Sequence, residues 1–322
     1  MRAIIVRAPG EPEALETVEV DEPVPGPRQV RIRVAAAAVN PVDAVTRSGA
    51  LAAAGLMPAF GPGDGGPAGR ETIGIGWDVA GTVDAVGPGT TRLVSGDEVI
   101  GLRDRLDVPL GAYADALVLD EDAVARAPRS LDAAHAATLP LNGLTAFQAL
   151  DLLDLPAGAS VLVTGAAGAV GGYAVELAAH RGLRVVASAS AADEDLVRGF
   201  GAELFVPRGA HLGDAVRALV PGGVDSAVDT ALLSITALDA VRNGGGFVAV
   251  SGGPAVPTPL RGIRVHNVWI SADAAQLGHL AVLADAGHLT PRVAATLPLE
   301  QAVEAHRRLE KGGLRGRLVL IP

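Results

Sequence analysis

The sequence predicts an α/β protein of two domains: a β-rich N-terminal domain and a second domain built on a doubly wound parallel sheet. Its 322 residues fit about two domains of ordinary size. Short β-rich runs alternate with turn signals up to about residue 120, and strand patterns alternate with helix patterns after about residue 122. Hydrophobic residues make up 49% of the chain and charged residues 19%, which is enough apolar material for a sizeable core.

The strands of the first domain are expected at "AIIVRA", "QVRIRVAAAAV", "GTVDAVG", "DEVIGL" and "ADALVL". Several short strands at this spacing are typical of a β-rich, barrel-like domain. Residues 51–70 are rich in Gly, Pro and Ala and have no hydrophobic period. We therefore expect a mobile loop there.

The second domain begins its alternation at "SVLVTG", a strand that is followed by a helix through Leu177. Further strands are expected at "LRVVASAS", "AELFV", "SAVDT", "GGFVAV" and "VHNVWIS", and helices at "ADEDLVRGFG", "HLGDAVRALV" and "ITALDAVRN". Near-continuous apolar strands joined by helices indicate a parallel sheet that is covered on both faces. The tail "PLEQAVEAHRRLEKGG" predicts an amphipathic helix, and "GRLVLIP" a last strand.

A glycine-rich turn lies between the first strand and the first helix of this second domain. In "GAAGAVGG" the spacing Ala166-x-Gly168-x-x-Gly171 matches G-x-G-x-x-G with alanine at its first position. A strand before it and a helix after it supply the context in which such a turn binds a dinucleotide pyrophosphate. We assign this role to the turn residues Gly165, Ala166, Ala167, Gly168, Ala169 and Val170. A tight strand-to-helix connection that binds nothing stays open as the alternative.

The end of the second strand of this unit discriminates between cofactors. An NAD-preferring site places Asp or Glu about 20 residues after the glycine motif, where it binds the ribose 2′-hydroxyl. Here that position is Ser188, and Ser190 follows it. Because no carboxylate would repel a 2′-phosphate and two hydroxyls could bind it, the sequence favours NADPH. No arginine or lysine adjoins these serines in the chain.

Charge and cysteine content exclude several classes of function. The net charge is −10 and no long basic run occurs, which disfavours nucleic acid and anionic membranes as partners. The absence of cysteine excludes disulfides, cysteine nucleophiles and thiolate zinc sites. The N-terminus has no signal-peptide core and no apolar stretch is long enough to span a membrane, so we expect a soluble, cytoplasmic protein.

Several stretches together resemble one family. They are "AAVNPVDAVTRSG", "GWDVAGTVDAVGPGTTRLVSGDEVIG", "GAYADALVL", "AATLPLNGLTAFQAL", "VLVTGAAGAVGG" and "LPLEQAVEAHRRLEKGGLRGRLVL". They look like the medium-chain dehydrogenase/reductase superfamily and, within it, its zinc-independent, zeta-crystallin-like quinone oxidoreductase branch. The resemblance implies a GroES-like catalytic domain at residues 1–121, completed by 279–322, and a Rossmann domain at 122–278. It also implies an active site in the cleft between them and a homodimer formed through the strand near Val265 to Ile270.

The zinc-dependent relatives hold their catalytic metal with residues that this chain lacks. By resemblance, Asn40, Trp77, and Leu141 or Asn142 stand where those relatives have ligands. These residue types do not make a zinc site, so we expect no metal. A Lewis acid is needed to ionise a simple alcohol, but an already electrophilic conjugated carbon accepts hydride without one.

The resemblance also implies roles for individual residues. Asn40 is expected beside the nicotinamide, where it positions the substrate, with a turn asparagine as the alternative. For Asp43 we favour a structural cap or ion pair over proton transfer, and Trp77 either lines the cleft or packs in the core. Tyrosines that help define the quinone pocket in relatives are replaced near Val45 and Leu51, which leaves solvent as the proton source. Met57 and Phe60 are possible pocket residues. Toward the cofactor, the resemblance and the strand ends indicate Asn142, Thr145, Thr230, Ser251 and Gly252.

These observations predict a zinc-independent oxidoreductase that transfers hydride from NADPH to a quinone or an α,β-unsaturated carbonyl. Two alternatives stay open: a non-catalytic NADPH-binding regulatory or structural protein, and a biosynthetic enoyl reductase. The Tyr-x-x-x-Lys pair of short-chain dehydrogenases is absent, and so is the G-x-S-x-G elbow of serine hydrolases.

Overall fold

The computed structural model describes residues 1–57, 71–105, 109–251 and 256–322. The chain forms two compact units. The first comprises Met1–Leu141, Ser271–Asp285 and Pro291–Pro322, and the second comprises Asn142–Ile270 and Ala286–Thr290. The expected boundary at residue 121 therefore lies inside the first unit, because β8 (Val124–Arg126) pairs with β6 (Glu98–Leu102) of that unit.

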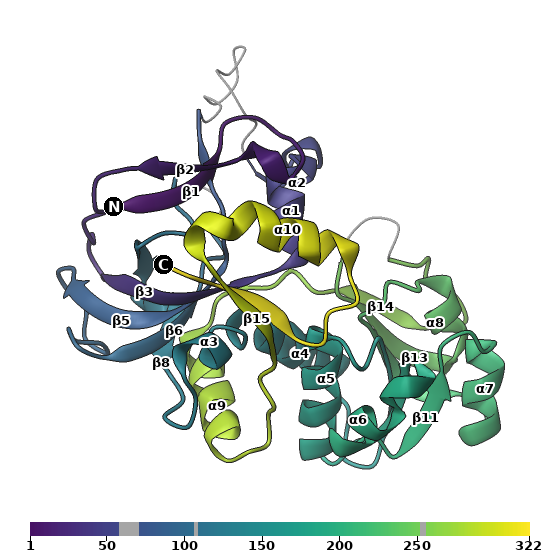
Figure 1. Cartoon of the computed structure of the whole chain (residues 1–322). Coiled ribbons are helices and arrows are strands. Elements are labelled where there is room, and N and C mark those ends of the chain that lie inside the picture. The colour runs from purple at the N-terminus through teal and green to yellow at the C-terminus, as the bar shows by residue number, and fades with distance from the viewer. Residues whose placement is uncertain (58–70, 106–108, 252–255) are drawn as a thin grey trace. The chain divides into compact units, whose positions relative to one another are not determined.

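The first unit is built mainly on antiparallel strands, with β15 and β16 paired in parallel (Figure 1). A seven-stranded sheet has the order β15-β16-β3-β5-β6-β8, with β7 also paired to β3, and a three-stranded sheet has the order β2-β1-β4. Its remaining strands are β1 (Arg2–Val6), β2 (Leu15–Glu19), β3 (Gln29–Val39), β4 (Ile73–Gly74), β5 (Asp78–Val86), β7 (Ala116–Asp120), β15 (Val293–Pro298) and β16 (Arg317–Ile321). Its helices are α1 (Pro41–Arg47), α2 (Ala50–Ala53), α3 (Ala133–Ala136), α9 (Ala274–Asp285) and α10 (Ala302–Lys311).

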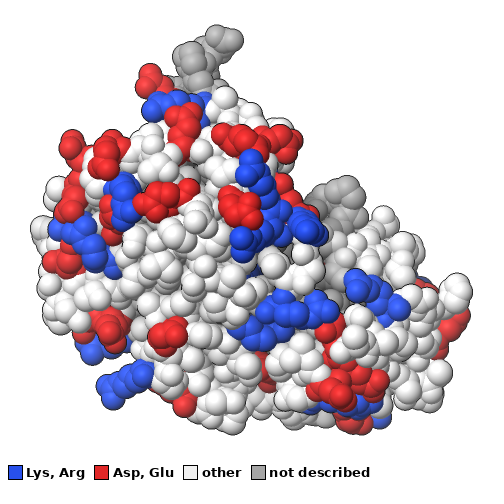
Figure 2. All heavy atoms as spheres, in the orientation of Figure 1, with Lys and Arg blue, Asp and Glu red and all other residues white. Residues whose placement is uncertain are grey.

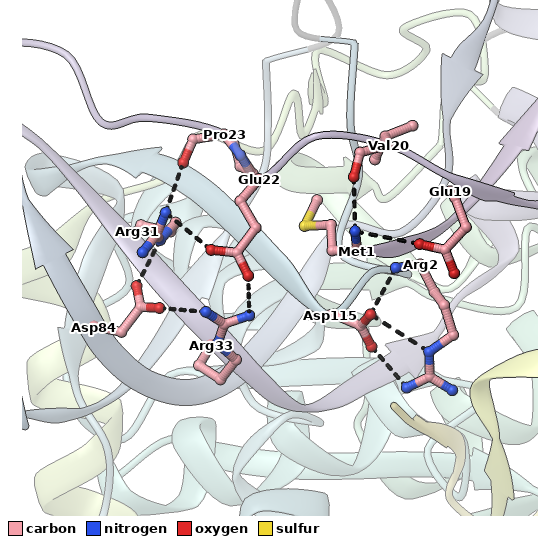
Figure 3. Close-up of polar contacts among 10 residues, drawn as sticks. All are labelled: Met1, Arg2, Glu19, Val20, Glu22, Pro23, Arg31, Arg33, Asp84 and Asp115. Carbon is pink, nitrogen blue, oxygen red and sulfur yellow. Dashed lines mark hydrogen bonds and ion pairs between the residues drawn. The ribbon is translucent and has the colours of Figure 1, made fainter.

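Strand β3 shows why these residues form a half-buried strand. Val30, Ile32 and Val34 are buried and belong to the hydrophobic core, whereas the arginines between them point away from it. Arg31 and Arg33 both bind Asp84 of the neighbouring strand β5, at 2.8 and 2.7 Å (Figure 3). These cross-strand ion pairs fix the register of β3 against β5 on the outer face.

The second unit holds a six-stranded, fully parallel sheet of order β11-β10-β9-β12-β13-β14. The strands are β9 (Ser160–Thr164), β10 (Arg184–Ala189), β11 (Leu204–Pro207), β12 (Val224–Asp229), β13 (Val241–Ala249) and β14 (Arg264–Asn267). The helices are α5 (Ala169–His180), α6 (Glu194–Gly199), α7 (Leu212–Leu219) and α8 (Ile235–Asp239), and α4 (Pro140–Leu153) begins in the first unit. The order reverses between β9 and β12, which is the switch point of a Rossmann sheet, so the predicted α/β class is confirmed.

Two local predictions differ from the structure. Residues Ala50–Ala53 form helix α2 inside the expected 51–70 loop, and Met57 is part of the hydrophobic core. The expected helix "ITALDAVRN" ends at Asp239, because Val241 already begins β13 by pairing with Val224. Phe60 and most of the expected loop lie outside the described residues.

Candidate active site

The predicted glycine turn connects β9 to α5 at the carboxyl end of the parallel sheet. Gly165 follows β9 with φ of +59°, a conformation that favours glycine. A Cβ on Gly171 would lie 2.2 Å from the carbonyl oxygen of Gly165, so the first turn of α5 accepts only glycine there. Gly168 is the N-cap of α5 and is exposed. Exposed backbone at a helix N-terminus fits a pyrophosphate, because the positive end of the helix dipole lies there and the first helical turn directs its N–H groups toward the ligand.

The other predicted cofactor residues are placed as follows. Ala166 and Ala167 are buried, whereas Ala169 and Val170 are half-buried. Asn142 and Thr145 are both buried on α4. Ser251 is exposed just after β13, and Gly252 lies outside the described residues.

A buried carboxylate that the sequence analysis did not select joins this turn to the neighbouring loop. Asp229 ends β12, is fully buried and accepts hydrogen bonds from the Thr164 hydroxyl at 2.6 Å and the Ser234 backbone N–H at 2.7 Å. Ser234 has φ of +53°, a strained conformation for a residue other than glycine. Thr230 in turn donates to the Thr164 carbonyl. Asp229 thus fixes the loop at the switch point, and a lone carboxylate at the end of an apolar strand was the signal for it.

The end of β10 holds the two serines that were predicted to face the 2′-phosphate. Ser188 is buried and Ser190 is half-buried. The structure also brings Arg208, which is distant in the sequence, to this strand end. Its backbone N–H donates to the Ala189 carbonyl at 2.6 Å. Arg208 is exposed, and its guanidinium pairs with no acidic residue in the described part of the chain. The backbone of Arg208 therefore lies at the end of β10, next to Ala189, with Ser188 and Ser190 on either side of Ala189 in the chain.

Asn40, the predicted substrate residue, lies in the first unit as the N-cap of α1. It is fully buried, and its side-chain Nδ2 donates to Asp78 Oδ2 at 2.8 Å and to the Ala38 carbonyl at 3.4 Å. A carbonyl can only accept, so this pair of contacts assigns the amide orientation. Asp78 Oδ1 accepts the Leu141 N–H at 2.6 Å, one of the N–H groups that the first turn of α4 leaves without a helical partner. Asp78, which the sequence analysis did not select, thus binds both Asn40 and α4.

Asp43 has the capping role that the sequence analysis favoured over proton transfer. Its Oδ2 accepts the Asn40 backbone N–H at 2.8 Å and the Tyr113 hydroxyl at 3.0 Å. Burial raises the pKa of Asp43 and of Asp78 to about 7, against the lowering effect of these hydrogen bonds and of the Arg317 charge. Near neutral pH these two carboxyl groups are therefore only partly ionised.

Trp77 is 7% exposed and stands outside the hydrophobic cluster to which Ile75 and Val79 belong. Its indole Nε1 has no hydrogen-bond partner among the residues that the structure describes. Its backbone is held on one side, because the Arg103 N–H donates to the Trp77 carbonyl at 2.8 Å. Core packing alone does not account for a buried indole N–H without an acceptor.

A second buried polar chain connects α1 to α10 behind this site. The Arg47 guanidinium donates to His306 Nδ1 at 3.0 Å and pairs with Glu310 at 2.5 Å. His306 is fully buried and meets the Tyr113 ring edge-on, with centroids 5.9 Å apart. Burial and the nearby Arg47 charge lower the pKa of His306 to about 3, so the imidazole stays neutral across the physiological range.

Comparison with known proteins identifies the family. The model of the alcohol dehydrogenase GroES-like domain matches residues 26–129, and that of the zinc-binding dehydrogenases matches residues 200–320. The NADPH-dependent alkenal/one oxidoreductase of Arabidopsis thaliana is 32% identical over 91% of this chain and 72% of its own length. The quinone oxidoreductase of Mus musculus is 31% identical over 100% of this chain and 98% of its own. The chain belongs to the medium-chain dehydrogenase/reductase superfamily, in its zinc-independent quinone oxidoreductase branch.

The solved structure of an NAD-dependent alcohol dehydrogenase is similar over 100% of both chains, with a TM-score of 0.86 and 31% identity. Proteins named for different cofactors and substrates thus share this fold, so the residues of the site have to discriminate between these functions.

Within the described ranges, no group of three or more His, Cys, Asp or Glu side chains comes together as a metal-binding set. None of the described helices is long and apolar enough to cross a membrane. On the face drawn in Figure 2, acidic and basic side chains are interspersed.

Proposed function

We propose that this oxidoreductase transfers hydride from NADPH to a quinone or an α,β-unsaturated carbonyl without zinc. The proposal rests on the combination of two features. The glycine turn fits a dinucleotide. By resemblance, Asn40 and Trp77 occupy positions where zinc-dependent relatives have metal ligands. The names of the Arabidopsis and mouse relatives support the substrate class.

The residues that would hold NADPH come from the second unit. The turn from Gly165 to Val170 would bind the pyrophosphate through backbone N–H groups. Ser188, Ser190 and Arg208 would bind the 2′-phosphate, and this set is the reason to propose NADPH over NADH. We assign Thr230, Ser251, Gly252, Asn142 and Thr145 to the ribose and nicotinamide end, which follows their predicted roles.

The bound cofactor supplies the hydride, and the chain's own residues position the acceptor and exclude water. Asn40 would hold the reactants from the first unit, with Asp43 and Asp78 fixing it from behind. We propose water as the final proton donor, because the Tyr113 hydroxyl is fully buried and already donates to Asp43.

We further propose a homodimer formed through β14. This strand lies at the edge of the parallel sheet, where unpaired backbone groups can continue the sheet into a second copy. Trp269 follows it and is 63% exposed, as is typical of an aromatic side chain at an interface.

The test is NADPH oxidation by the purified protein against a panel of quinones and conjugated enones. NADH, added zinc and a chelator serve as controls. Turnover with NADPH that neither zinc nor chelator changes supports the proposal. Tight NADPH binding without turnover of any acceptor would contradict it and favour the binding-protein alternative, and faster turnover with NADH would refute the cofactor assignment.

A further inference from the structure

Two histidines from distant parts of the chain meet on the second unit. His180 is the last residue of α5, and His288 lies in the segment Ala286–Thr290. Their ring centroids are 4.5 Å apart, and the two ring planes are inclined to each other by 46°. Both residues are exposed, and neither imidazole has a hydrogen bond or an ion pair with another described residue. This ring contact therefore brings two metal-ligating side chains together at a place that solvent reaches.

The segments that carry the two histidines are held together by a further contact. The Thr290 backbone N–H donates to Glu176 Oε2 at 3.2 Å, and Glu176 lies one helical turn before His180 on α5. Leu289, the residue that follows His288, is buried. A ligand that joins the two imidazoles therefore binds segments that are already in place, and it does not have to order them first.

The electrostatics at this end of α5 favour a cation. The C-terminal end of a helix carries the negative end of its dipole, and His180 belongs to the last turn. The next residue, Arg181, pairs with Asp151 of α4 at 2.8 Å, and its guanidinium lies 4.6 Å from the centre of the Phe147 ring. Because a carboxylate of α4 compensates the charge of Arg181, this arginine does not take the place of a cation at the histidines.

Paired imidazoles bind a particular class of cations. A neutral imidazole offers one nitrogen lone pair, and divalent copper, nickel and zinc accept such ligands, with Cu²⁺ bound most tightly. Mg²⁺ and Ca²⁺ prefer oxygen ligands instead. Two nitrogens that bind one tetrahedral zinc ion at about 2.0–2.1 Å lie about 3.3 Å apart. Rings with centroids 4.5 Å apart reach this separation by rotation of their exposed side chains.

The histidine pair lies away from the residues that are assigned to the cofactor. The glycine turn is at the N-terminal end of α5, and 12 residues of helix, about 17 Å, separate it from the far end of His180. By resemblance, neither histidine is one of the positions at which zinc-dependent relatives hold their catalytic ion. A metal ion on this pair would thus join two segments of the second unit without contacting the glycine turn.

We propose that His180 and His288 form a binding site for one divalent transition-metal ion of the class that prefers imidazole ligands, with water completing its coordination. The bound ion would link α5 to the segment Ala286–Thr290. This site is independent of the proposed hydride transfer, so the two proposals can fail separately.

Calorimetric titration of the untagged protein with Cu²⁺ at neutral pH tests the site. His180→Gln and His288→Gln each remove one ligand, so each should weaken Cu²⁺ binding about 100-fold, because the second ligand acts at a high effective concentration. His211→Gln is the matched control, since His211 is an exposed histidine of the same unit, at the N-terminus of α7. It should leave the Kd for Cu²⁺ within about twofold of the parent value, and Mg²⁺ should not bind to any of these proteins.

Three results of this titration would overturn the proposal. The first is a parent that shows no saturable binding of Cu²⁺. The second is a change below about threefold in either glutamine variant, which leaves a single histidine or none as the ligand. The third is an equal loss of affinity in His211→Gln, which means that the ion binds to scattered histidines.

Hydrogen exchange tests the link between the two segments. Saturating Zn²⁺ should slow the exchange of the backbone N–H groups of Ala286–Thr290, because an ion bound to both histidines opposes local opening. His180→Gln changes α5 alone and should abolish this protection, and unchanged exchange in the parent overturns the link. The affinity for NADPH should be the same in all variants within about twofold. A parent that does not bind NADPH refutes the proposed function instead and leaves the metal site standing.

Discussion

Replacing Arg208 by alanine should weaken NADPH binding and leave NADH binding unchanged. The Arg208 side chain is exposed and has no acidic partner in the described part of the chain, and its backbone N–H donates to the Ala189 carbonyl at the end of β10. The variant keeps that backbone hydrogen bond, so the end of β10 should hold its shape. NADH lacks the 2′-phosphate and therefore serves as the internal control.

The size of the effect follows from the exposure of Arg208. A hydrogen bond to a charged group contributes about 1.5–3 kcal/mol, and solvent screening of an exposed cation puts this pair at the low end. About 1.4 kcal/mol corresponds to a tenfold change, so the Kd for NADPH should rise about tenfold. High salt should reduce the difference between parent and variant, because the pair is screened.

Fluorescence titration of both cofactors gives the two Kd values directly. Arg184→Ala is the matched control: Arg184 begins the same strand at its opposite end and pairs with Glu203 at 2.8 Å. It should leave both Kd values unchanged. Equal losses for NADPH and NADH in Arg208→Ala would refute the reasoning, and so would a change in NADPH affinity below about twofold.

Three further predictions concern the frame of the site. Gly171→Ala should lower NADPH affinity at least about tenfold, because its Cβ would lie 2.2 Å from a backbone oxygen. Gly199→Ala, whose Cβ would meet nothing within 4 Å, should leave the affinity unchanged. Titration of both variants with NADPH measures the difference. Asp229→Asn should lose about 1–3 kcal/mol in urea unfolding and bind NADPH more weakly, since one of two buried donors loses its acceptor; unchanged values would contradict this role. Between pH 7 and pH 5, the free energy of unfolding of His306→Gln should rise by about 2 kcal/mol relative to that of the parent. The pKa of His306 is about 3 in the folded state and 6.5 in the unfolded state, so in this range only the unfolded parent takes up a proton, which destabilises its folded state. Parallel pH profiles of the two proteins would rule out this linkage.

The sequence pattern alone predicted those parts of the fold that depend on residues close together in the chain. The apolar run before "GAAGAVGG" and the small residues within it predicted the strand, the turn and the helix correctly, because each constraint lies within a few residues. The helix expected over "ITALDAVRN" failed at Val241, where pairing with β12 outweighed the helical period. Helix propensity could not reveal that competition.

The contacts that define the site are the ones that sequence could not supply. Asn40 meets Asp78 across 38 residues, and Asp229 meets Thr164 across 65. Arg208 reaches the end of β10 only because the register of β11 places Pro207 beside Ala189. Residue type indicated candidates near the turn, but the partners that fix them follow from strand order and register.

The positions that bind zinc in relatives have been rebuilt here around one carboxylate. Asp78 holds the Asn40 amide through one oxygen and the Leu141 backbone N–H through the other, so one carboxylate links two positions that, by resemblance, lie at or next to zinc ligands of relatives. Trp77, the third, is the chain neighbour of that anchor. Because burial raises the pKa of Asp78 to about 7, this anchor is not a strongly charged group near neutral pH. A buried amide and a weakly ionised carboxyl offer no strong Lewis acid to ionise an alcohol. The rebuilt positions therefore favour reduction of a conjugated acceptor over oxidation of an alcohol.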